Sequence, residues 1–440
     1  MLTRRDSLRL ALLALVGPPV LAACGGDGDN DGGGRMTVDS DVDLLSSERG
    51  RAPGRPEAIP DVVAAMHGFA GGVYDGLAAT PGNLVLSPYS IAVALGMTLA
   101  GAAGRTATEM RDVLGVDDDA RFHGGLNALT SYVEDLAGEQ ERMDGSKAEV
   151  ALDGANQLFG QRGVGWERRF LDLLAEEYGA GMRLVDYETA AEDARQLINR
   201  WVAGRTQDRI TDLIAPGVLD AMSRLVLVNA IYLKAPWEHP FDTSLTAMAP
   251  FHLADGGTVD VETMRSSEVR GSVARGSGWR AARIPYAGGR LAMTVVLPDP
   301  GRTGDVERLV AGGDLGDLLA GGRPTVLDLE LPKWTFRTNA PLGDRLVELG
   351  MPTAFDRTRA DFRPMTEEDL DLYISAVVHE GFIAVDEEGT EAAAATAVVM
   401  TEASAPVAQP FHVDRPFLFV IHDVEHGTPL FLGRVDDPSA

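Results

Sequence analysis

Apolar residues recur at helical spacing through much of the first half of the chain. Asp61 and Ser87 are residue types that cap helix N-termini, and Pro88 suits a first helical position. The apolar positions that follow them predict helices over 62–77 and 90–103. The same periodicity predicts further helices over 107–114, 167–178 and 192–203.

Short runs of β-branched and aromatic residues take over in the second half. They predict strands over 224–233, 257–264, 291–297, 325–331, 372–378 and 417–422. Helices that come first and strands that come later, without regular alternation, are typical of the α+β class rather than of a doubly wound sheet.

The segment EEGTEAAAATAVVM, residues 387–400, interrupts this strand-rich half. Its alanines favour a helix. The run before it, 372–385, has the composition of a strand, and the stretch after it, up to Pro410, has that of a loop. The segment therefore has two interpretations: a surface helix over 391–397, or a strand that is not yet part of a sheet.

Composition and charge narrow the classes of partner. The chain has 440 residues, is 45% hydrophobic and carries a net charge of −27. It has enough apolar side chains for a substantial core. An acidic chain without a basic stripe is a poor match for nucleic acid or for an anionic membrane surface. No second linker follows residue 59, so residues 59–440 are predicted to form a single domain.

The first 24 residues have the composition of an export signal. Arg4 and Arg5 precede an apolar stretch, 8–23, that Gly17, Pro18 and Pro19 interrupt, too short and broken to span a membrane. TRRDSLRL resembles a twin-arginine signal, and LAAC, ending at Cys24, resembles a lipoprotein cleavage box. This resemblance implies a lipid-modified Cys24, a membrane anchor and an extracytoplasmic location. Ordinary secretion with a chance cysteine is the alternative.

Residues 25–58 are rich in Gly and Asp and have no apolar periodicity, which predicts a flexible tether. Asp27, Asp29 and Asp31, followed by Gly32, imitate the start of a calcium-binding loop. The acidic ligand at the end of such a loop would fall on Val38, so a calcium site is rejected.

Motifs for catalysis are missing from the sequence. Gly-x-Ser-x-Gly does not occur, and the zinc motif His-Glu-x-x-His fails after His379–Glu380. AGAAGRT, 100–106, lacks the Lys and the spacing of a phosphate loop, and no Cys–His pairing has metal spacing. A serine triad stays open, because its members need only meet in space. The expectation is a protein that is not an enzyme and needs no metal or cofactor.

Five segments in order make the chain similar to the serpins, protease inhibitors that work by changing shape. They are NLVLSPYSIAVALGMTLAGAAGRTATEM (83–110), LVNAIYLKAPWEHPF (227–241), LELPKWTF (329–336), AVVHEGFIAVDEEGTEAAAATAVV (376–399) and DRPFLFVIHDVEHGTPLFLGRVDDP (414–438). The resemblance implies a monomer with a helix-rich N-terminal half, a large central sheet A, two smaller sheets and an exposed reactive-centre loop over about 387–412. A non-inhibitory, serpin-fold binding protein is the alternative.

The resemblance also implies a mechanism in which a protease cuts the loop and the loop's front half inserts into sheet A as a new strand. Alternate side chains of an inserted strand must enter a core. Glu391 is at an odd position and could face outward, and Gly389 suits a hinge. The alternate positions are small or apolar: Thr390, Ala392, Ala394, Thr396, Val398 and Met400. The implied hinge is Glu387, Glu388, Gly389, Thr390, Glu391, Ala392, Ala393, Ala394 and Ala395.

Counting in the family's usual register from Gly389 places the scissile bond at Ala403–Ser404, with Glu402 as the alternative anchor residue. Ala403 would suit elastase-like or subtilisin-like serine proteases, whereas Glu402 would suit a glutamate-specific one. The absence of Arg and Lys between Gly389 and Arg415 disfavours trypsin-like targets. A small anchor discriminates weakly, so a broad target range is expected.

Two further sets of residues carry over as control points for the opening of sheet A. Trp237 and Lys333 resemble the place where the loop first enters, with an ion pair between Lys333 and Glu387. Ser87, Ser90, Asn229 and His379 resemble a hydrogen-bonded cluster beneath the central strands. The ordinary interpretation of the same residues is a core aromatic, a helix cap and satisfied buried polar groups.

Overall fold

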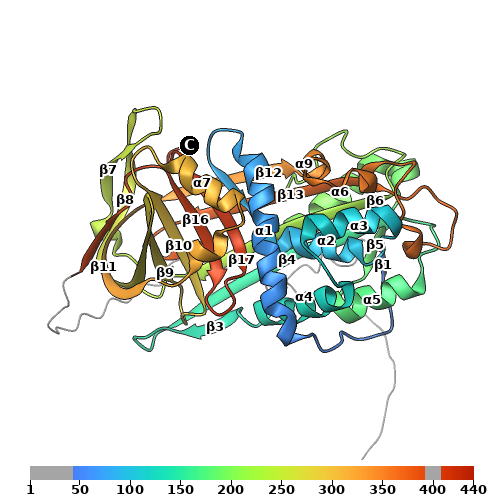
Figure 1. Ribbon diagram of the computed structural model, residues 1–440, viewed down its shortest axis with the longest axis horizontal. Helices are drawn as coiled ribbons and strands as arrows, with labels where there is room; N and C mark the ends of the chain where they lie inside the picture. Colours follow the sequence, from blue (N-terminus) through green and yellow to red (C-terminus); the bar gives the residue numbers. More distant parts are fainter. Residues whose placement is uncertain (1–42, 392–407) are drawn as a thin grey trace, which may run out of the picture. The chain divides into compact units, whose positions relative to one another are not determined.

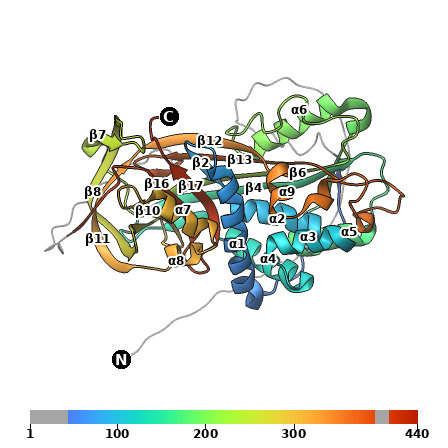
Figure 2. The ribbon, with the colours of Figure 1, turned by 45° about the horizontal axis from the view of Figure 1, so that its top comes forward.

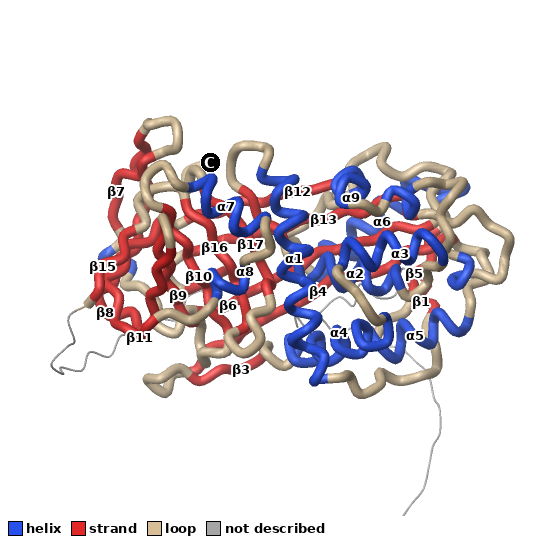
Figure 3. Tube along the Cα trace, viewed as in Figure 1, coloured by secondary structure: helices blue, strands red, loops and turns tan. Residues whose placement is uncertain are grey.

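The computed structural model describes residues 43–391 and 408–440, which build two sheets and the helices around them (Figures 1 and 3). Sheet A has the strand order β1-β5-β4-β6-β14-β13-β12, with β3 paired to β4. Its strands are β1 (Asp43–Leu45), β3 (Gly138–Glu141), β4 (Lys147–Gln161), β5 (Met182–Val185), β6 (Leu225–Pro236), β12 (Trp334–Pro341), β13 (Ile374–Val385) and β14 (Gly389–Thr390).

The helices gather in the first half of the chain, as predicted. Those that the structure describes are α1 (Ile59–Ala78), α2 (Pro88–Leu99), α3 (Gly104–Leu114), α4 (Asp119–Glu134), α5 (Arg168–Tyr178), α6 (Tyr187–Arg205), α7 (Thr303–Ala311), α8 (Leu315–Leu319) and α9 (Gly343–Leu349). None of the described helices is both long and apolar enough to cross a membrane.

The two predicted helix caps have different outcomes. Ser87 caps α2, since its side chain accepts a hydrogen bond from the backbone N–H of Ser90. Asp61 caps nothing and lies in the first turn of α1, where its negative charge still suits the positive end of the helix. Helix α2 ends at Leu99, short of the predicted residue 103.

The predicted strands are all present, and several more exist. Helix α4 and strand β4 are absent from the prediction although both are long. Strand β4 lies in the half whose pattern is helical, and the first part of its sequence, KAEVALDGAN, mixes polar and small residues. Its partner β6 is a continuous apolar run, and the two strands pair along ten residues of β4, 151–160.

Both faces of sheet A are covered, which explains why β6 is apolar throughout. Leu225 and Leu227 belong to the main core, on the side of α2, whereas Val226 and Val228 pack with α6 in a second core. Figure 2 shows α6 on one side of these strands and α2 on the other. A strand covered on both faces has no polar face to alternate with.

The second sheet has nine strands in the order β15-β11-β8-β9-β10-β16-β17-β2, with β7 paired to β8. The two smaller sheets that the resemblance implies are joined here, because β8 runs for 19 residues and pairs with β7, β9 and β11. The strands are β2 (Leu84–Leu86), β7 (Ala247–His252), β8 (Thr258–Gly276), β9 (Trp279–Pro285), β10 (Leu291–Pro298), β11 (Arg323–Pro332), β15 (Gln409–His412), β16 (Phe417–Asp423) and β17 (Pro429–Val435).

The folded region begins before residue 59, so the predicted tether over 25–58 is too long. Strand β1 pairs with the edge strand β5. After it, the backbone N–H of Ala52 donates to Glu176, that of Arg55 donates to Gly124, and Arg51 forms an ion pair with Glu134. The composition of the segment gives no sign of these contacts, because the segment has no periodic apolar face.

Candidate functional site

Strand β14, which is only Gly389 and Thr390, lies between β6 and β13. We call the boundary between β6 and β13 the seam, and β14 lies at one end of it. From Ile374 to Gly381, β13 pairs directly with β6 in parallel, and this is the closed part of the seam. At the parted end, Thr390 pairs with Ala235 on one side and Val385 on the other, antiparallel to both strands.

A tight turn delivers β14 into the sheet. The Asp386 carboxylate accepts hydrogen bonds from the backbone N–H groups of Glu388 and Gly389. Gly389 has φ 155°, and a Cβ there would lie 2.3 Å from the carbonyl oxygen of Ala235. Both its conformation and this close approach require glycine.

Aromatic side chains line the parted end of the seam. Trp237 is fully buried and stacks on Tyr286, with ring centroids 4.5 Å apart. Its indole N–H donates to the Asp386 carbonyl oxygen at 3.0 Å. The Tyr286 hydroxyl lies 2.6 Å from the Thr390 hydroxyl. The small side chain of Thr390 therefore enters the core, as the alternation predicts, and finds a polar partner there.

Lys333 and Glu387 form the predicted ion pair at the base of the hinge, with Nζ and Oε2 3.1 Å apart. The Glu387 side chain is 10% exposed and the Lys333 side chain 29%. Burial raises the pKa of the Glu387 carboxyl, but hydrogen bonds from Thr246 and Lys333 outweigh it and leave that pKa below its usual value. The pair thus keeps Glu387 ionised at the parted end of the seam, where the hinge enters sheet A.

The four residues expected beneath the central strands meet on the α2 side of the closed part. Asn229 donates from Nδ2 to the Ser90 hydroxyl at 2.7 Å, and the Ser87 N–H donates to His379 Nε2 at 3.1 Å. Asn156 of β4 joins them, because its Oδ1 accepts from both Asn229 and Ser90. We call these five residues the buried polar cluster.

The hydrogen bonds of His379 fix its protonation state. Because Nε2 accepts from Ser87, the ring proton is on Nδ1, which donates to Asn229 Oδ1. Complete burial lowers the pKa of His379 to about 3. A second ring proton would face the Ser87 N–H and break this bond, so the cluster requires a neutral histidine.

Glu391 differs from the prediction that it faces outward. Arg209 lies against it, and the two side chains form an ion pair. The Glu391 side chain is only 9% exposed as a result. Several predicted residues lie outside the described residues: Cys24, Ala392, Ala393, Ala394, Ala395, Glu402, Ala403 and Ser404.

Comparison with known proteins identifies the family. Residues 64–438 match the family described as Serpin (serine protease inhibitor). The chain belongs to the serpin family. A serpin-like protein of Thermococcus kodakarensis is 37% identical over 86% of this chain and 86% of its own length. The leukocyte elastase inhibitor of Homo sapiens is 33% identical over 81% of this chain and 93% of its own length.

Solved serpins have the same fold. The native state of tengpin, a thermophilic serpin, matches with a TM-score of 0.79 and 26% identity, over 90% of this chain and 99% of that one. The serpin fold predicted from the sequence is therefore confirmed, including the large sheet A with its helices. Most members of this family are protease inhibitors, which are not catalysts.

Sequence reasoning missed several residues of this serpin site. Asn156 lies on the unpredicted strand β4, and Tyr286 and Arg209 are far in sequence from the hinge residues that they contact. Arg142, at the turn between β3 and β4, donates from Nε to the Trp237 carbonyl oxygen at 2.8 Å. Only Asp386 carried a local signal, since Asp shortly before Gly is typical of a turn.

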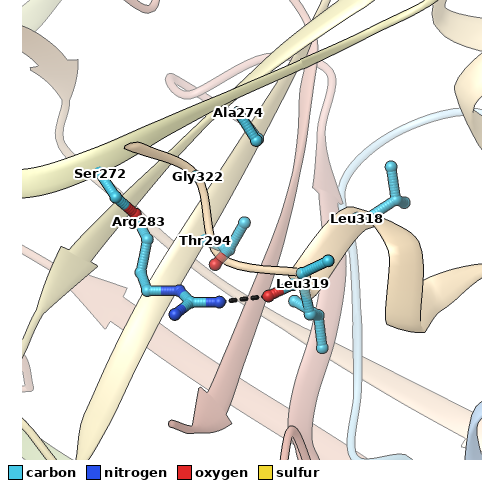
Figure 4. Close-up of a pocket in the computed structure, with 9 residues that line it drawn as sticks. Ser272, Ala274, Arg283, Thr294, Leu318, Leu319 and Gly322 are labelled. Atoms are coloured by element: carbon cyan, nitrogen blue, oxygen red, sulfur yellow. Dashed lines mark hydrogen bonds between the residues drawn. The ribbon is translucent and has the colours of Figure 1, made fainter. Parts of the chain in front are cut away.

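The described residues have two hollows away from the seam, and the larger, of about 360 Å³, lies between α1, α3 and α9. Among residues 43–391 and 408–440, no three His, Cys, Asp or Glu side chains group as metal ligands. The hollow between β9, β10 and α8 has a volume of only about 10 Å³. The Arg283 guanidinium lies in it and donates to the Leu319 carbonyl oxygen (Figure 4). The hollow is too small for a ligand larger than water.

Proposed function

We propose that this serpin inhibits serine proteases as a suicide substrate. A protease would cut it near Ala403–Ser404, and residues of about 389–402 would then insert between β6 and β13. The observation that carries this proposal is that Thr390 already pairs with both strands and Gly389 with β6. A strand that has begun to form needs only to continue along the seam.

The chemistry comes from the protease. Its serine hydroxyl attacks the Ala403 carbonyl carbon, the bond to Ser404 breaks, and the new amino terminus at Ser404 leaves. The protease then holds Ala403 as an ester. Insertion of the residues before Ala403 carries the linked protease along sheet A and distorts its active site before water can cleave the ester.

Interstrand hydrogen bonding favours the inserted state over the intact one. Insertion replaces the parallel pairing of β6 with β13 by two antiparallel pairings, one on each side of the new strand. Antiparallel pairs are slightly more stable per residue, and the number of interstrand hydrogen bonds doubles. The alternating small side chains of the hinge can enter the same core that already holds Thr390.

Elastase-like and subtilisin-like proteases are the proposed targets, and a glutamate-specific protease is the target if Glu402 is the anchor. The small side chain of Ala403 supports the first choice. The relationship to leukocyte elastase inhibitors supports it at the level of the family.

The test is to incubate the purified chain with elastase, subtilisin, trypsin and a glutamate-specific protease, then to run denaturing gels and sequence the cleaved loop by mass spectrometry. A covalent band at the summed mass, with a cut at or near Ala403–Ser404, is expected with at least one of the first two proteases. Cleavage by all of them without such a band would instead favour the alternative, a non-inhibitory binding protein.

The export signal supports a place for this inhibitor outside the cytoplasm, with Cys24 lipid-modified as its membrane anchor. Replacing the residue, Cys24→Ser, should move the protein from the membrane fraction to the soluble extracytoplasmic fraction. An unchanged distribution would leave ordinary secretion as the explanation.

A further inference from the structure

Backbone strain is concentrated where the hinge leaves sheet A. Among the residues that the structure describes, three other than glycine have φ in the left-handed region: Gln207 at 50°, Asp208 at 59° and Glu391 at 50°. Such conformations persist only where their surroundings hold them, and they collect at functional sites. Here the two strained segments, 182 residues apart in sequence, touch through Arg209 and Glu391.

The turn after α6 fixes the position of Arg209. The N–H of Asp208 donates to the Ala203 carbonyl oxygen at 2.8 Å, and that of Arg209 donates to Thr206 at 2.9 Å. With Gln207 and Asp208 both left-handed, the chain reverses sharply at the end of the helix. The Arg209 guanidinium then lies 5.8 Å from the ring centre of Phe382 on β13 and contacts the Glu391 carboxylate.

Glu391 comes directly after β14. Its backbone N–H still donates to Ala384 of β13, at 2.8 Å. Its φ of 50°, however, is incompatible with a strand, which needs about −120° to −140°. The next residues can join the sheet only if Glu391 rotates out of this conformation, which would also swing its carboxylate away from Arg209.

The Glu391 carboxylate depends on Arg209 for its charge. Burial raises the pKa of this carboxyl, and the hydrogen bond from Arg209 is the main effect that opposes the rise. Once a buried carboxylate loses its cation it carries an uncompensated charge, which is costly. The ion pair and the left-handed backbone therefore support each other.

We propose that Arg209 is a positioning residue that holds Glu391 as a stop, limiting insertion of the hinge to Gly389 and Thr390 until a protease has cut the loop. The stop rests on the proposed function, since without insertion there is nothing to limit. It acts at the other end of β14 from Lys333–Glu387: that pair anchors the hinge before it enters the sheet, and Arg209–Glu391 restrains the chain after it.

The two test variants are Arg209→Gln, which removes the positive charge and shortens the side chain, and Glu391→Gln, which removes the negative charge at the same side-chain length. Arg200→Gln is the control for the loss of an arginine, because Arg200 is exposed on α6, the helix that ends shortly before Arg209. The intact chains are warmed for increasing times, and the fraction that has become resistant to unfolding in urea is measured. Resistance reports insertion of the uncut loop, since a strand has been added to sheet A.

We expect both single variants to convert on the order of ten-fold faster than the wild type, the change that about 1.4 kcal/mol off a barrier produces. Arg200→Gln should convert at the wild-type rate. The double variant should be no faster than either single one, because the two residues act through one contact. Single variants that convert at the control rate, or a double variant whose effects multiply, would overturn the stop.

A parallel measurement separates failure of the stop from failure of the proposed function. The wild type is cut with subtilisin and its resistance to urea is compared with that of the intact chain. If the cut chain gains none, insertion does not occur, and the proposed function and the stop both fail. If it gains resistance but Arg209→Gln behaves like Arg200→Gln, only the stop is wrong.

Discussion

The two parts of the seam show one strand pair in two states. At the parted end, β14 separates β6 from β13, and the site is aromatic, with Trp237 and Tyr286 packed around Thr390. In the closed part, β6 and β13 pair directly above the buried polar cluster. The first state resembles the product of insertion and the second resembles its starting point.

The difference indicates that the two parts of the seam have different roles. The parted end already holds Thr390, because its small side chain packs among aromatic rings and its hydroxyl has the Tyr286 hydroxyl as a partner. The buried polar cluster loses specific hydrogen bonds if the strands separate, and each unpaired buried group costs about 1–3 kcal/mol. In the proposed mechanism, the cluster therefore resists insertion in the intact chain, and its groups must find new partners once the seam opens.

The largest expected effect is at the parted end. Thr390→Arg would force a long, charged side chain into the core beside Tyr286, so covalent trapping should be lost while cleavage of the loop continues. Thr108→Arg is the matched control, because Thr108 is exposed on α3, and it should trap normally. Gel assays with subtilisin measure both variants; a covalent complex with Thr390→Arg at the control yield would contradict the comparison.

In the closed part, loss of a hydrogen-bonding side chain should lower the stability of the chain more than it would at the parted end. Asn229→Ala leaves the Nδ1–H of His379 and the Ser90 hydroxyl without this partner, both fully buried. We expect the free energy of unfolding of the intact chain to fall by about 3 kcal/mol, as measured by urea denaturation. A loss below about 1 kcal/mol would mean that the cluster does not hold the seam closed.

Acid should weaken the closed part through His379. Its pKa is about 3 in the folded chain and 6.5 in the unfolded one, so the unfolded state binds the proton between these values. The contribution is fully present above pH 6.5 and is lost as pH falls toward 3. From pH 7 to about 5 it amounts to about 2 kcal/mol.

The variant His379→Gln isolates the contribution of His379 to this loss of stability, which urea titrations at pH 7 and pH 5 measure. Its stability should fall less with acid than that of the wild type, by about the same 2 kcal/mol. Some acid sensitivity should remain, because burial also lowers the pKa values of His123 and His422, each to about 4. Equal acid sensitivity in the two proteins would exclude His379 as the responsible group.

A smaller effect is expected from Gly389→Ala, whose new Cβ would clash with the Ala235 carbonyl oxygen. Expulsion of β14 should expose Trp237 and shift tryptophan fluorescence to longer wavelength. Gly138→Ala is the control, since Gly138 has φ 107° with no atom near its added Cβ. Identical spectra for the two variants would show that β14 tolerates the clash.

The smallest effect should come from Lys333→Met. The lysine is partly exposed, so the pair with Glu387 should contribute no more than about 1 kcal/mol. Urea titrations at low and high salt measure it, and the difference from the wild type should shrink at high salt. A difference that salt does not change would point to lost packing rather than lost charge.

The sequence was sufficient for the class of fold and for the contacts of Ser87 with His379 and of Lys333 with Glu387, but for different reasons. The helix cap at Ser87 and the apolar run of β6 follow from local patterns. The meeting of Ser87 with His379, 292 residues later, followed only from resemblance to a family. Local patterns carry no information about such long-range contacts.

The roles of residues that act only through contacts between distant segments could not be predicted from the sequence. Asn156 was hidden because β4 has no clear strand pattern, and Arg209 has its role only because a strained turn aims it at Glu391. The early start of the fold at β1 was hidden in the same way, since a short strand at a sheet edge is defined by its partner β5 and not by its own composition.

The most direct test of the account is a reversible lock across the closed part of the seam. Val228 and Val378 are paired neighbours on β6 and β13, and the sequence has only one native cysteine, Cys24. The double variant Val228→Cys/Val378→Cys is oxidised, and disulfide formation is checked by mass spectrometry against both single variants. With the strands linked, subtilisin should cut the loop without forming a covalent complex, and reduction should restore trapping. Trapping at the wild-type yield while the disulfide is intact would contradict insertion between β6 and β13.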